Sequence, residues 1–322
     1  MKVAVLCGGR SSEHDVSLRS GEAVARGLQE AGHEPLLMTI ARNGSWSFRG
    51  APLELMPAAG LHGADAAFPA LHGPFGEDGS IQGMLEWLDV PYVGSDVLAS
   101  AVCMDKLTLK RLFAQAALPQ VEFTAVGEAG WRDRCEAMGL PLWVKPSRLG
   151  SSVGISKVEA LGVELDAAVE LALRHDPRVI VEASAHGREV ECSLLGNDEP
   201  KPSLPGEVVA HSEWYDYETK YSDGGMELVV PAPLSDEQTN RLQELALGAF
   251  RLGGCSGLAR CDFFVEPDGE ILVNEINTMP GFTETSVYAK LWEASGLNYP
   301  DLCDRLVQLA IERHAKARSY EF

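Results

Sequence analysis

The sequence predicts a mixed fold, with an α/β segment built on a doubly wound sheet followed by α+β segments. In the first 90 residues, short apolar runs alternate with stretches of helical periodicity, which is typical of parallel strands joined by helices. Later β-rich runs follow one another with turn residues between them, which indicates antiparallel pairing. At 322 residues the chain is long enough for two or three domains, and we expect three, over residues 1–98, 99–183 and 184–322.

The first domain opens on a continuous apolar run at 3–6, as expected for a parallel strand buried on both faces. Gly8 and Gly9 end this strand, and a helix with apolar or small residues on one face follows over 16–31. Gly32 ends the helix. The remaining elements of this domain are predicted over 35–40 (strand), 66–71 (strand) and 80–88 (helix). Ligands of such sheets bind near the carboxyl ends of the strands, where we expect the site.

The other two domains are predicted to be α+β. A break near 92–96 precedes a long helix over 106–117. The middle domain has strands over 142–145, 155–158 and 179–182, with a helix between the last two. The last domain has strands over 189–195 and 203–210, a polar and aromatic loop over 211–226, and two helices that close the chain.

The strongest local signal is a hairpin over 258–277 with a Glu-Pro-Asp-Gly turn. If Pro267 faces the residue that follows this turn, Asp262 lies opposite Glu275 and Arg260 opposite Asn277, all on one face. Carboxylates roughly 5 Å apart repel unless a cation lies between them, and all-oxygen ligands suit Mg²⁺. A solvated acidic face neutralised by Arg260 is the alternative, and we favour the metal.

A loop rich in Gly and Ser, over 145–154, could hold a phosphate. Gly and Ser let backbone N–H groups approach an anion closely, and Lys145 adds a positive charge. The order of residues is not that of a P-loop. Most Gly/Ser loops are simply flexible. Taken alone, this loop is therefore better interpreted as a flexible loop than as a phosphate site.

Composition narrows the class of partner and the compartment. The formal net charge of −20 makes nucleic acid a poor partner, so an anionic ligand needs a pocket with local cations. Seven scattered cysteines without a C-x-x-C pair are typical of free thiols in a reducing compartment. No apolar stretch reaches membrane-spanning length, and no charged segment followed by a long apolar run precedes the first strand. We therefore expect a cytoplasmic protein.

Six motifs in order, within residues 3–294, resemble the D-alanine–D-alanine ligases of the ATP-grasp superfamily. They are GGRSSEHDVS at 8–17, LHG at 71–73 with GEDG at 76–79, MDK at 104–106, KPSRLGSSVG at 145–154, YDYETKY at 215–221 and NEINTMPGFT at 274–283. The resemblance implies an ATP-grasp fold with a Rossmann-like first domain that binds substrate. It also implies a ligase that joins two D-alanines into D-alanyl-D-alanine through a D-alanyl phosphate, for peptidoglycan precursor synthesis.

The resemblance further implies where ATP and metal bind. The residues matching the ATP site are Lys106 and Lys145 on the phosphates, Ser152 in the phosphate loop, Lys220 over the γ-phosphate, Glu182, Ala183 and Ala185 in the adenine hinge, and Glu189 on the ribose. The residues matching ligands of two Mg²⁺ ions, for which Mn²⁺ could substitute, are Asp262, Glu275 and Asn277, with Glu275 bridging. Three lysines at these positions would explain an anion site in so acidic a protein.

The catalytic and substrate-binding residues are also implied by the match. Arg260 and the Gly281 N–H would stabilise the tetrahedral oxyanion, and Glu13 would hold the ammonium of the first D-alanine. The residues matching the other roles are Ser286 and Val287 at the carboxylate of the second substrate, Ser151 and Tyr221 hydrogen-bonded with Glu13, and His72 beside the first substrate. A histidine that only caps the loop is the alternative for His72. A homodimer is expected.

Two positions depart from the family pattern. Many members carry an acid where this chain has Leu149, and Lys or Gln where it has Ala183. The first departure concerns how the phosphate loop is latched, and the second removes a polar contact to the nucleotide. Neither touches the metal or oxyanion positions.

Three other functions are the alternatives. Within the family, a ligase making D-alanyl-D-lactate or D-alanyl-D-serine is the nearest, but resistance-type ester-forming ligases typically carry His where this chain has Tyr221. Another ATP-grasp ligase, acting on a peptide or a carbon-backbone acid, does not account for the ordered motifs. A nucleotide-binding regulator without catalysis would be expected to lose Arg260 or a metal ligand, and none is lost.

Overall fold

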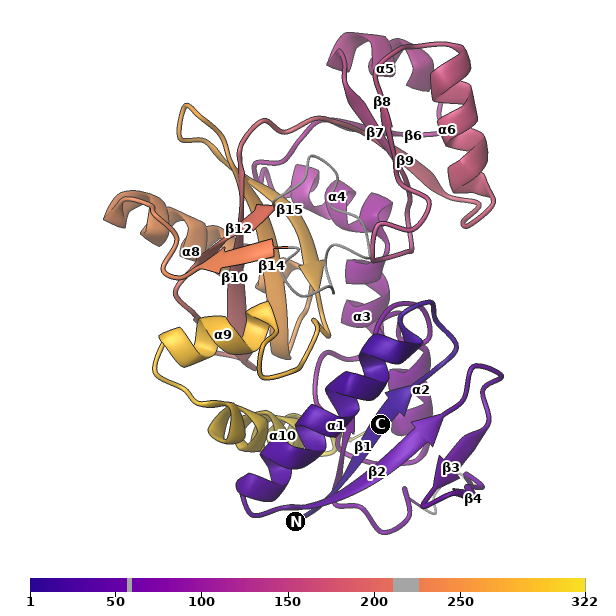
Figure 1. Cartoon of the computed structure of the whole chain (residues 1–322), viewed down its shortest axis with the longest axis vertical. Helices are drawn as coiled ribbons and strands as arrows, with labels where there is room; N and C mark the ends of the chain where they lie inside the picture. The colour runs from indigo at the N-terminus through magenta and orange to yellow at the C-terminus, as the bar shows by residue number, and fades with distance from the viewer. Residues whose placement is uncertain (57–59, 211–225, 322) are drawn as a thin grey trace.

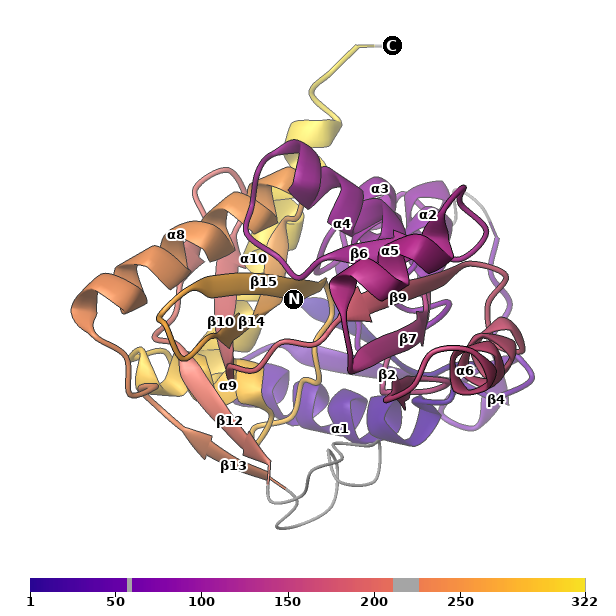
Figure 2. The same ribbon diagram turned by 90° about the horizontal axis from the view of Figure 1, so that it is seen from above.

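The computed structural model describes residues 1–56, 60–210 and 226–321, and arranges them around three sheets (Figure 1). We call these the first, middle and last sheets, in chain order. Seen from above in Figure 2, the last sheet with helix α8 lies on one side, and the middle sheet with helices α5 and α6 on the other. The functional site is built where these three layers meet.

The first sheet has the predicted doubly wound arrangement. Its strand order is β4-β3-β2-β1-β5, and β1 pairs in parallel with both β2 and β5. The elements are β1 (Lys2–Gly8), α1 (His14–Glu30), β2 (Glu34–Ile40), β3 (Trp46–Phe48), β4 (Ala51–Pro52), β5 (Ala66–Pro69) and α2 (Ser80–Trp87). Val3 and Val5 pack towards α1, whereas Ala4 and Leu6 pack towards α2, so helices cover both faces. The short strands β3 and β4, which the sequence did not predict, extend the sheet antiparallel.

Helix α1 approaches its neighbours closely because it carries glycines at the contacts. A Cβ at Gly21 would lie 2.4 Å from the Cβ of Cys7, and one at Gly27 would lie 2.8 Å from the ring of Tyr299. A larger residue at Gly21 would push the helix away from strand β1, and one at Gly27 would push it away from α10 (Tyr299–Ala317). Close packing here fixes the start of α1, where Glu13 lies.

The middle sheet has the order β6-β9-β7-β8 and is covered by two helices. The elements from the first sheet onward are α3 (Val97–Met104), α4 (Lys106–Gln115), β6 (Phe123–Ala125), α5 (Trp131–Met138), β7 (Leu142–Pro146), β8 (Ser156–Val158), α6 (Val163–Leu173) and β9 (Val179–Ala183). The predicted strands over 142–145, 155–158 and 179–182 are confirmed to within a residue. Helices α3 and α5 and strand β6 were not predicted.

The last sheet has one face covered by a helix and the other facing the site. Its order is β13-β12-β10-β14-β15, with β11 paired to β10. Its elements are β10 (Arg188–Gly196), β11 (Lys201–Pro202), β12 (Gly206–Ala210), β13 (Met226–Val229), α8 (Asp236–Leu252), β14 (Gly257–Val265), β15 (Ile271–Asn277) and α9 (Val287–Ala294). Val190, Cys261 and Val273 pack against α8. Because side chains alternate along a strand, the residues between them project from the opposite face.

The predicted pairing at the candidate metal ligands is confirmed, but the predicted pairing at the turn is wrong by one residue. Asp262 lies opposite Glu275 and Arg260 opposite Asn277, whereas Phe263 pairs with Val273. The register therefore shifts between these pairs, which leaves Asn274 as the extra residue of a β-bulge. Nearer the turn, Glu266 and not Pro267 bonds to Glu270.

The first and last sheets share one hydrophobic core. It joins Val3 and Val5 of β1 to Leu258 of β14, to Phe282 in the segment after β15, and to Leu306 of α10. The middle sheet has a separate core that includes Val144 and Val181. None of the helices among the described residues is long and apolar enough to cross a membrane.

Candidate active site

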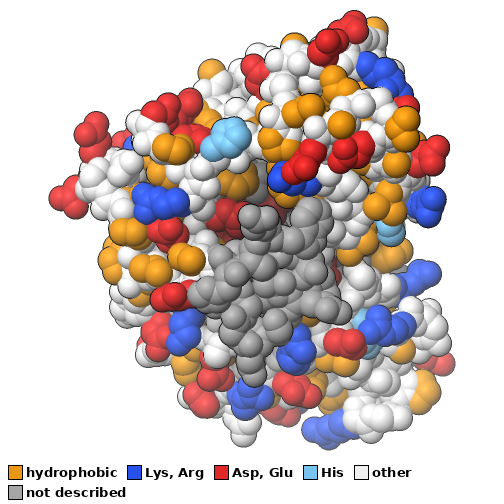
Figure 3. Space-filling view, turned by 45° about the horizontal axis from the view of Figure 1, so that its top comes forward, with side chains coloured by type: hydrophobic (Ala, Val, Ile, Leu, Met, Phe, Trp, Pro, Cys, Tyr) orange, Lys and Arg blue, Asp and Glu red, His pale blue; other side chains and the backbone are white. Residues whose placement is uncertain are grey.

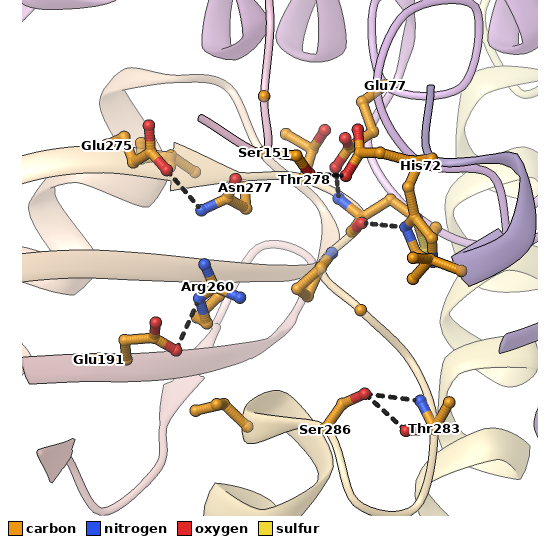
Figure 4. A pocket seen from close by; sticks show the side chains of 18 of the residues that line it. His72, Glu77, Ser151, Glu191, Arg260, Glu275, Asn277, Thr278, Thr283 and Ser286 are labelled. Carbon is orange, nitrogen blue, oxygen red and sulfur yellow. Dashed lines mark hydrogen bonds and ion pairs between the residues drawn. The ribbon is translucent and has the colours of Figure 1, made fainter. Parts of the chain in front are cut away.

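A cavity of about 820 Å³ lies between the first sheet, the 147–154 loop and the open face of the last sheet (Figure 4). The predicted site residues that line it are Glu13, His72, Lys106, Ser151, Arg260, Glu275, Asn277, Gly281, Ser286 and Val287. The described site residues that do not line it are Lys145, Ser152, Glu182, Ala183, Ala185, Glu189 and Asp262. Lys220 and Tyr221, with most of the predicted closing loop over 211–226, lie outside the described residues.

The three candidate metal ligands lie together on strands β14 and β15. The amide nitrogen of Asn277 is 3.0 Å from Asp262 Oδ2 and 3.4 Å from Glu275 Oε1, and it donates to both. Lys106 Nζ lies 3.6 Å from Glu275 Oε2. Two carboxylates and an amide are oxygen donors of the kind that a hard divalent cation prefers. A half-turn of the Asn277 amide would aim its oxygen at the same point, so the residues fit such an ion.

Arg260 is held between two carboxylates, one of which the sequence analysis missed. Its Nε and Nη2 each lie 2.7 Å from an oxygen of Asp262, and its Nε lies 2.9 Å from Glu191 Oε2. Glu191 lies on β10 directly opposite Asp262. Burial works against the charge on Arg260, but Asp262 and Glu191 raise its pKa well above the usual value. A fully charged guanidinium therefore faces the cavity.

A buried carboxylate shared by two lysines lies behind the cavity. Glu182 Oε2 is 2.6 Å from Lys145 Nζ, and Glu182 Oε1 is 3.4 Å from Lys110 Nζ. Burial alone would raise the pKa of Glu182, but the charges of Lys110 and Lys145 lower it to about 2. Burial lowers the pKa of Lys110, and Glu182 opposes this. Two lysines thus share one carboxylate, and the charges of Glu275 and Glu189 also act on Lys145.

The grouping of lysines inside the protein contrasts with the outer surface. On the face in Figure 3, acidic and basic side chains lie intermingled over the described residues. The described residues form no single basic patch on this face of a protein with a net charge of −20. Lys106, Lys110 and Lys145 instead lie together inside it. Clustered lysines of this kind favour an anion nearby.

The 147–154 loop reaches from the middle sheet to the first. Ser151 and Ser152 adopt left-handed backbone conformations, with φ of 52° and 58°, which non-glycine residues rarely adopt. This turn lets Ser151 Oγ donate to Glu13 Oε1, so the predicted contact between them is confirmed. Lys106 Nζ donates to the Leu149 carbonyl oxygen at 2.8 Å. The departure at Leu149 leaves this contact intact, because the backbone makes it.

The segment after β15 turns into helix α9 beside the cavity. Ser286 precedes the first residue of α9, and its Oγ accepts from Thr283 N at 2.9 Å. The first backbone N–H groups of a helix have no acceptor within the helix and attract anions. Ser286, Val287 and this helix start line the cavity, where such a helix start favours an anion.

Comparison with known proteins identifies the family. The sequence profile of the D-ala D-ala ligase C-terminus matches residues 112–308, and that of the N-terminus matches residues 2–59 and 54–95. The chain belongs to the D-alanine–D-alanine ligase family. A D-alanine–D-alanine ligase of Geobacillus kaustophilus is 42% identical over 100% of this chain and 97% of its own length. One of Solibacter usitatus is 44% identical over 100% of this chain and 99% of its own length.

Solved structures agree with this assignment. The D-alanine–D-alanine ligase of Coxiella burnetii superposes with a TM-score of 0.90 and 36% identity, covering 99% of this chain and 96% of that one. The VanG D-Ala:D-Ser ligase of Enterococcus faecalis superposes with a TM-score of 0.86 and 35% identity, covering 96% of this chain and 99% of that one. The chain is therefore an ATP-dependent ligase with the ATP-grasp fold, and its family depends on a divalent metal.

In this member of the D-alanine–D-alanine ligase family, the sequence did not reveal three residues in or beside the site, namely Lys110, Glu191 and Glu77. Lys110 lies one helical turn after Lys106 on α4, a spacing that places both on one face and could have revealed it. Glu191 alternates with Val190 along β10, as a site-facing residue should. Glu77, which lines the cavity, belongs to the GEDG motif, but nothing in its sequence spacing points to its contacts.

Proposed function

We propose that this chain joins two D-alanines into D-alanyl-D-alanine, driven by ATP, through a D-alanyl phosphate. The observation that carries the proposal is the cavity itself. It has Glu13 on one side, the start of α9 on another, and Arg260 between them, with lysines behind. Two amino acids and a nucleotide phosphate require such a set of opposed charges. The curated relatives at 42% and 44% identity, which are D-alanine–D-alanine ligases, support this choice of substrate.

We propose that ATP lies between the middle and last sheets. The residues assigned to it are Lys106, Lys145 and Lys220 at the phosphates, Ser152 in the phosphate loop, Glu182, Ala183 and Ala185 at the adenine, and Glu189 at the ribose. Asp262, Glu275 and Asn277 would hold one or two Mg²⁺ ions, with Mn²⁺ able to substitute. When bound, these ions supply positive charge that offsets the charge on the phosphates.

The amino-acid substrates are assigned to the two ends of the cavity. Glu13, fixed by Ser151 and in our proposal also by Tyr221, holds the ammonium of the first D-alanine, with His72 lining the same end. Arg260 and the Gly281 N–H hold the oxygen on which charge builds when the amine attacks. Ser286 and Val287 hold the carboxylate of the second D-alanine. These donors are in place before reaction, so they need little reorganisation.

The choice of second substrate is the first prediction. The likeness to a D-Ala:D-Ser ligase makes a D-alanyl-D-serine or D-alanyl-D-lactate product the competing function. At pH 7.5, with D-alanine and equal D-serine or D-lactate, we expect D-alanyl-D-alanine to dominate, separated by thin-layer chromatography of labelled products. A D-alanine zwitterion carries its own positive charge into the phosphate field, whereas D-lactate does not. D-Serine is also a zwitterion, so the expectation against it rests on the relatives named D-alanine–D-alanine ligases. Comparable yields of two products would contradict the proposal.

Replacing Lys110 with Met is the second prediction. The change leaves Lys145 as the one cation close to the buried Glu182 carboxylate in the described structure, so Lys145 should be held away from the phosphates. We expect the KM for ATP to rise at least about tenfold, and the KM for D-alanine to change less. Lys157→Met removes an exposed lysine from the same middle sheet and is the matched control. A KM for ATP within twofold of the parent would contradict this role.

We also propose that the chain forms a homodimer through helices α2 and α3. Trp87 is 78% exposed, Leu98 is 72% exposed and Val97 is 40% exposed. A Cβ at Gly83 would lie 3.9 Å from Val97 Cγ2, so the two helices present one apolar surface. Apolar surface of this kind is typical of an interface.

Light scattering after size exclusion tests the dimer. Trp87→Glu should shift the mass from two chains to one, because it would bury a charge in the interface. Val163→Glu, at an exposed apolar residue of α6, should not. A monomeric parent protein would refute the dimer.

Two further assignments complete the proposal. We place the domain divisions at 1–98, 99–183 and 184–322, which follow the first, middle and last sheets, although α10 packs on the first. We place the protein in the cytoplasm, since all seven cysteines are buried free thiols, as a reducing compartment keeps them.

A further inference from the structure

The segment 278–283, which carries Gly281, is held by residues of the loop between β5 and α2, more than 200 positions away in the chain (Figure 4). Met279 N donates to Glu77 Oε1 at 3.2 Å, and His72 Nδ1 lies 3.0 Å from the Met279 carbonyl oxygen. Both polar groups of the Met279 backbone are thus held by one loop. Glu77 also accepts from Gly73 N at 2.7 Å, which ties it to that loop.

A second attachment lies on the other side of Gly281. Phe282 N donates to Ser20 Oγ at 3.4 Å, and Ser20 Oγ lies 2.9 Å from His72 Nε2. Burial lowers the pKa of His72, with the charge of Glu13 opposing, so its ring carries one N–H. The Met279 carbonyl requires that hydrogen on Nδ1, which makes Nε2 the acceptor for Ser20. His72 therefore orders both attachments at once.

These contacts leave the Gly281 N–H, in a residue that lines the cavity, unused by the segment that surrounds it. Met279 and Phe282 use their N–H groups as described, Pro280 has none, and Thr283 N donates to Ser286 Oγ. Among the described residues, the Gly281 N–H has no protein acceptor. Its direction follows from the backbone on either side, which Glu77, His72 and Ser20 hold.

We propose that Glu77 and His72 are positioning residues that set the direction of the Gly281 N–H, and so place the oxyanion donor of the ligation. The proposal rests on the proposed function, in which Gly281 stabilises the tetrahedral oxyanion. An oxyanion donor works only when it is aimed at the oxygen in advance, so a small shift of the 278–283 segment would cost rate more than binding.

The electrostatics of Glu77 support its dependence on both contacts. Burial, and then the charge of Glu13, raise the pKa of Glu77 to about 8, while the N–H groups of Gly73 and Met279 oppose the rise. Losing either donor would raise that pKa further and favour a proton on the carboxylate. The two N–H groups therefore reinforce each other in favouring the charged form of Glu77.

Glu77→Gln tests the proposal, because Gln retains the volume but offers one acceptor oxygen instead of two. We expect kcat for D-alanyl-D-alanine synthesis to fall about 10- to 100-fold, less than the loss of a whole oxyanion donor. The KM values for ATP and D-alanine should stay within threefold. Affinity for a phosphinate analogue of D-alanyl-D-alanine, whose tetrahedral phosphorus imitates the intermediate, should fall by the same factor as kcat.

Gln82→Met is the matched control. Gln82 Nε2 donates to the Gly76 carbonyl at 2.8 Å, so it stabilises the same loop without contacting Met279. This variant should lower the melting temperature yet keep kcat within twofold. A merely structural role for Glu77 predicts that both variants lose melting temperature and that neither loses affinity for the phosphinate per active site.

A second pair of variants keeps the test decisive if Glu77→Gln does not fold. The amide nitrogen of Asn reaches the place of a histidine Nδ1, whereas that of Gln reaches the place of Nε2. His72→Asn should therefore be at least fivefold more active than His72→Gln. Equal activity of this pair, or a Glu77→Gln kcat within threefold of the parent, would overturn the proposal. A parent protein without D-alanyl-D-alanine product would instead refute the proposed function.

Discussion

Glu275→Gln is expected to abolish phosphoryl transfer while leaving the fold intact. Gln fills the same volume, so packing on β15 is unchanged, but it replaces an anionic ligand with a neutral amide. Removing one of two opposed carboxylates relieves their repulsion and offsets the lost ion pair with Lys106, so the melting temperature should change little. Substrate-dependent release of ADP is the measurement for the phosphoryl step, made with excess Mg²⁺.

A change of equal charge elsewhere on the hairpin is the control for Glu275. Glu270→Gln lies five residues earlier, at the exposed turn, and should retain full turnover. Near-normal ADP release by Glu275→Gln would refute the assignment of this residue to the metal. Restoration of its activity at high Mn²⁺ would support the assignment, because it would show a weakened but existing ion site.

Arg260→Lys should lower kcat by about 10²- to 10³-fold, as removal of an oxyanion donor does. Lysine preserves a positive charge between Asp262 and Glu191, so the protein should fold. Lysine lacks the planar guanidinium of Arg260, which contacts Asp262 with two nitrogens and has a further N–H left for the cavity. The steady-state kcat, with the melting temperature measured alongside, checks this expectation.

Arg188→Lys is the control for Arg260, since Arg188 pairs with Glu207 at the exposed end of the neighbouring strand β10. Its kcat should stay within twofold of the parent. If Arg260→Lys behaved in the same way, Arg260 would have to be regarded as a structural counter-charge to Asp262 and Glu191. The oxyanion would then depend on the Gly281 N–H.

The hairpin illustrates what the sequence could predict and what it could not. Alternation and the Glu-Pro-Asp-Gly turn were enough to place Asp262 opposite Glu275. They could not reveal the bulge at Asn274, because a bulge depends on how a strand packs against its neighbours and not on local propensity. The predicted pairing at the turn was one residue out, and the bulge shifts the register by one residue in the opposite sense. The two differences cancel, so the pairing of Asp262 with Glu275 was right although the turn was not.

Contacts between distant segments account for most of the rest. Lys110 was missed because a lysine on a helix is usually solvated, and only the packing of α4 on the middle sheet reveals its burial against Glu182. Glu77 was missed because its partner Met279 lies about two hundred residues further on. The roles of Glu13, His72, Arg260 and Gly281 came from the family resemblance, and their meeting at one cavity agrees with it.

The shared core of the first and last sheets has a consequence for synthesis on the ribosome. Val3 and Val5 are translated long before Leu306 and Val307, which belong to the same core. Until α10 leaves the ribosome, the core that α1 forms with the first sheet lacks the apolar side chains of α10 and stays partly exposed. Exposed apolar surface on a partly made chain is prone to aggregation and attracts chaperones. Folding of the core around the first sheet is therefore completed only after α10 has been released.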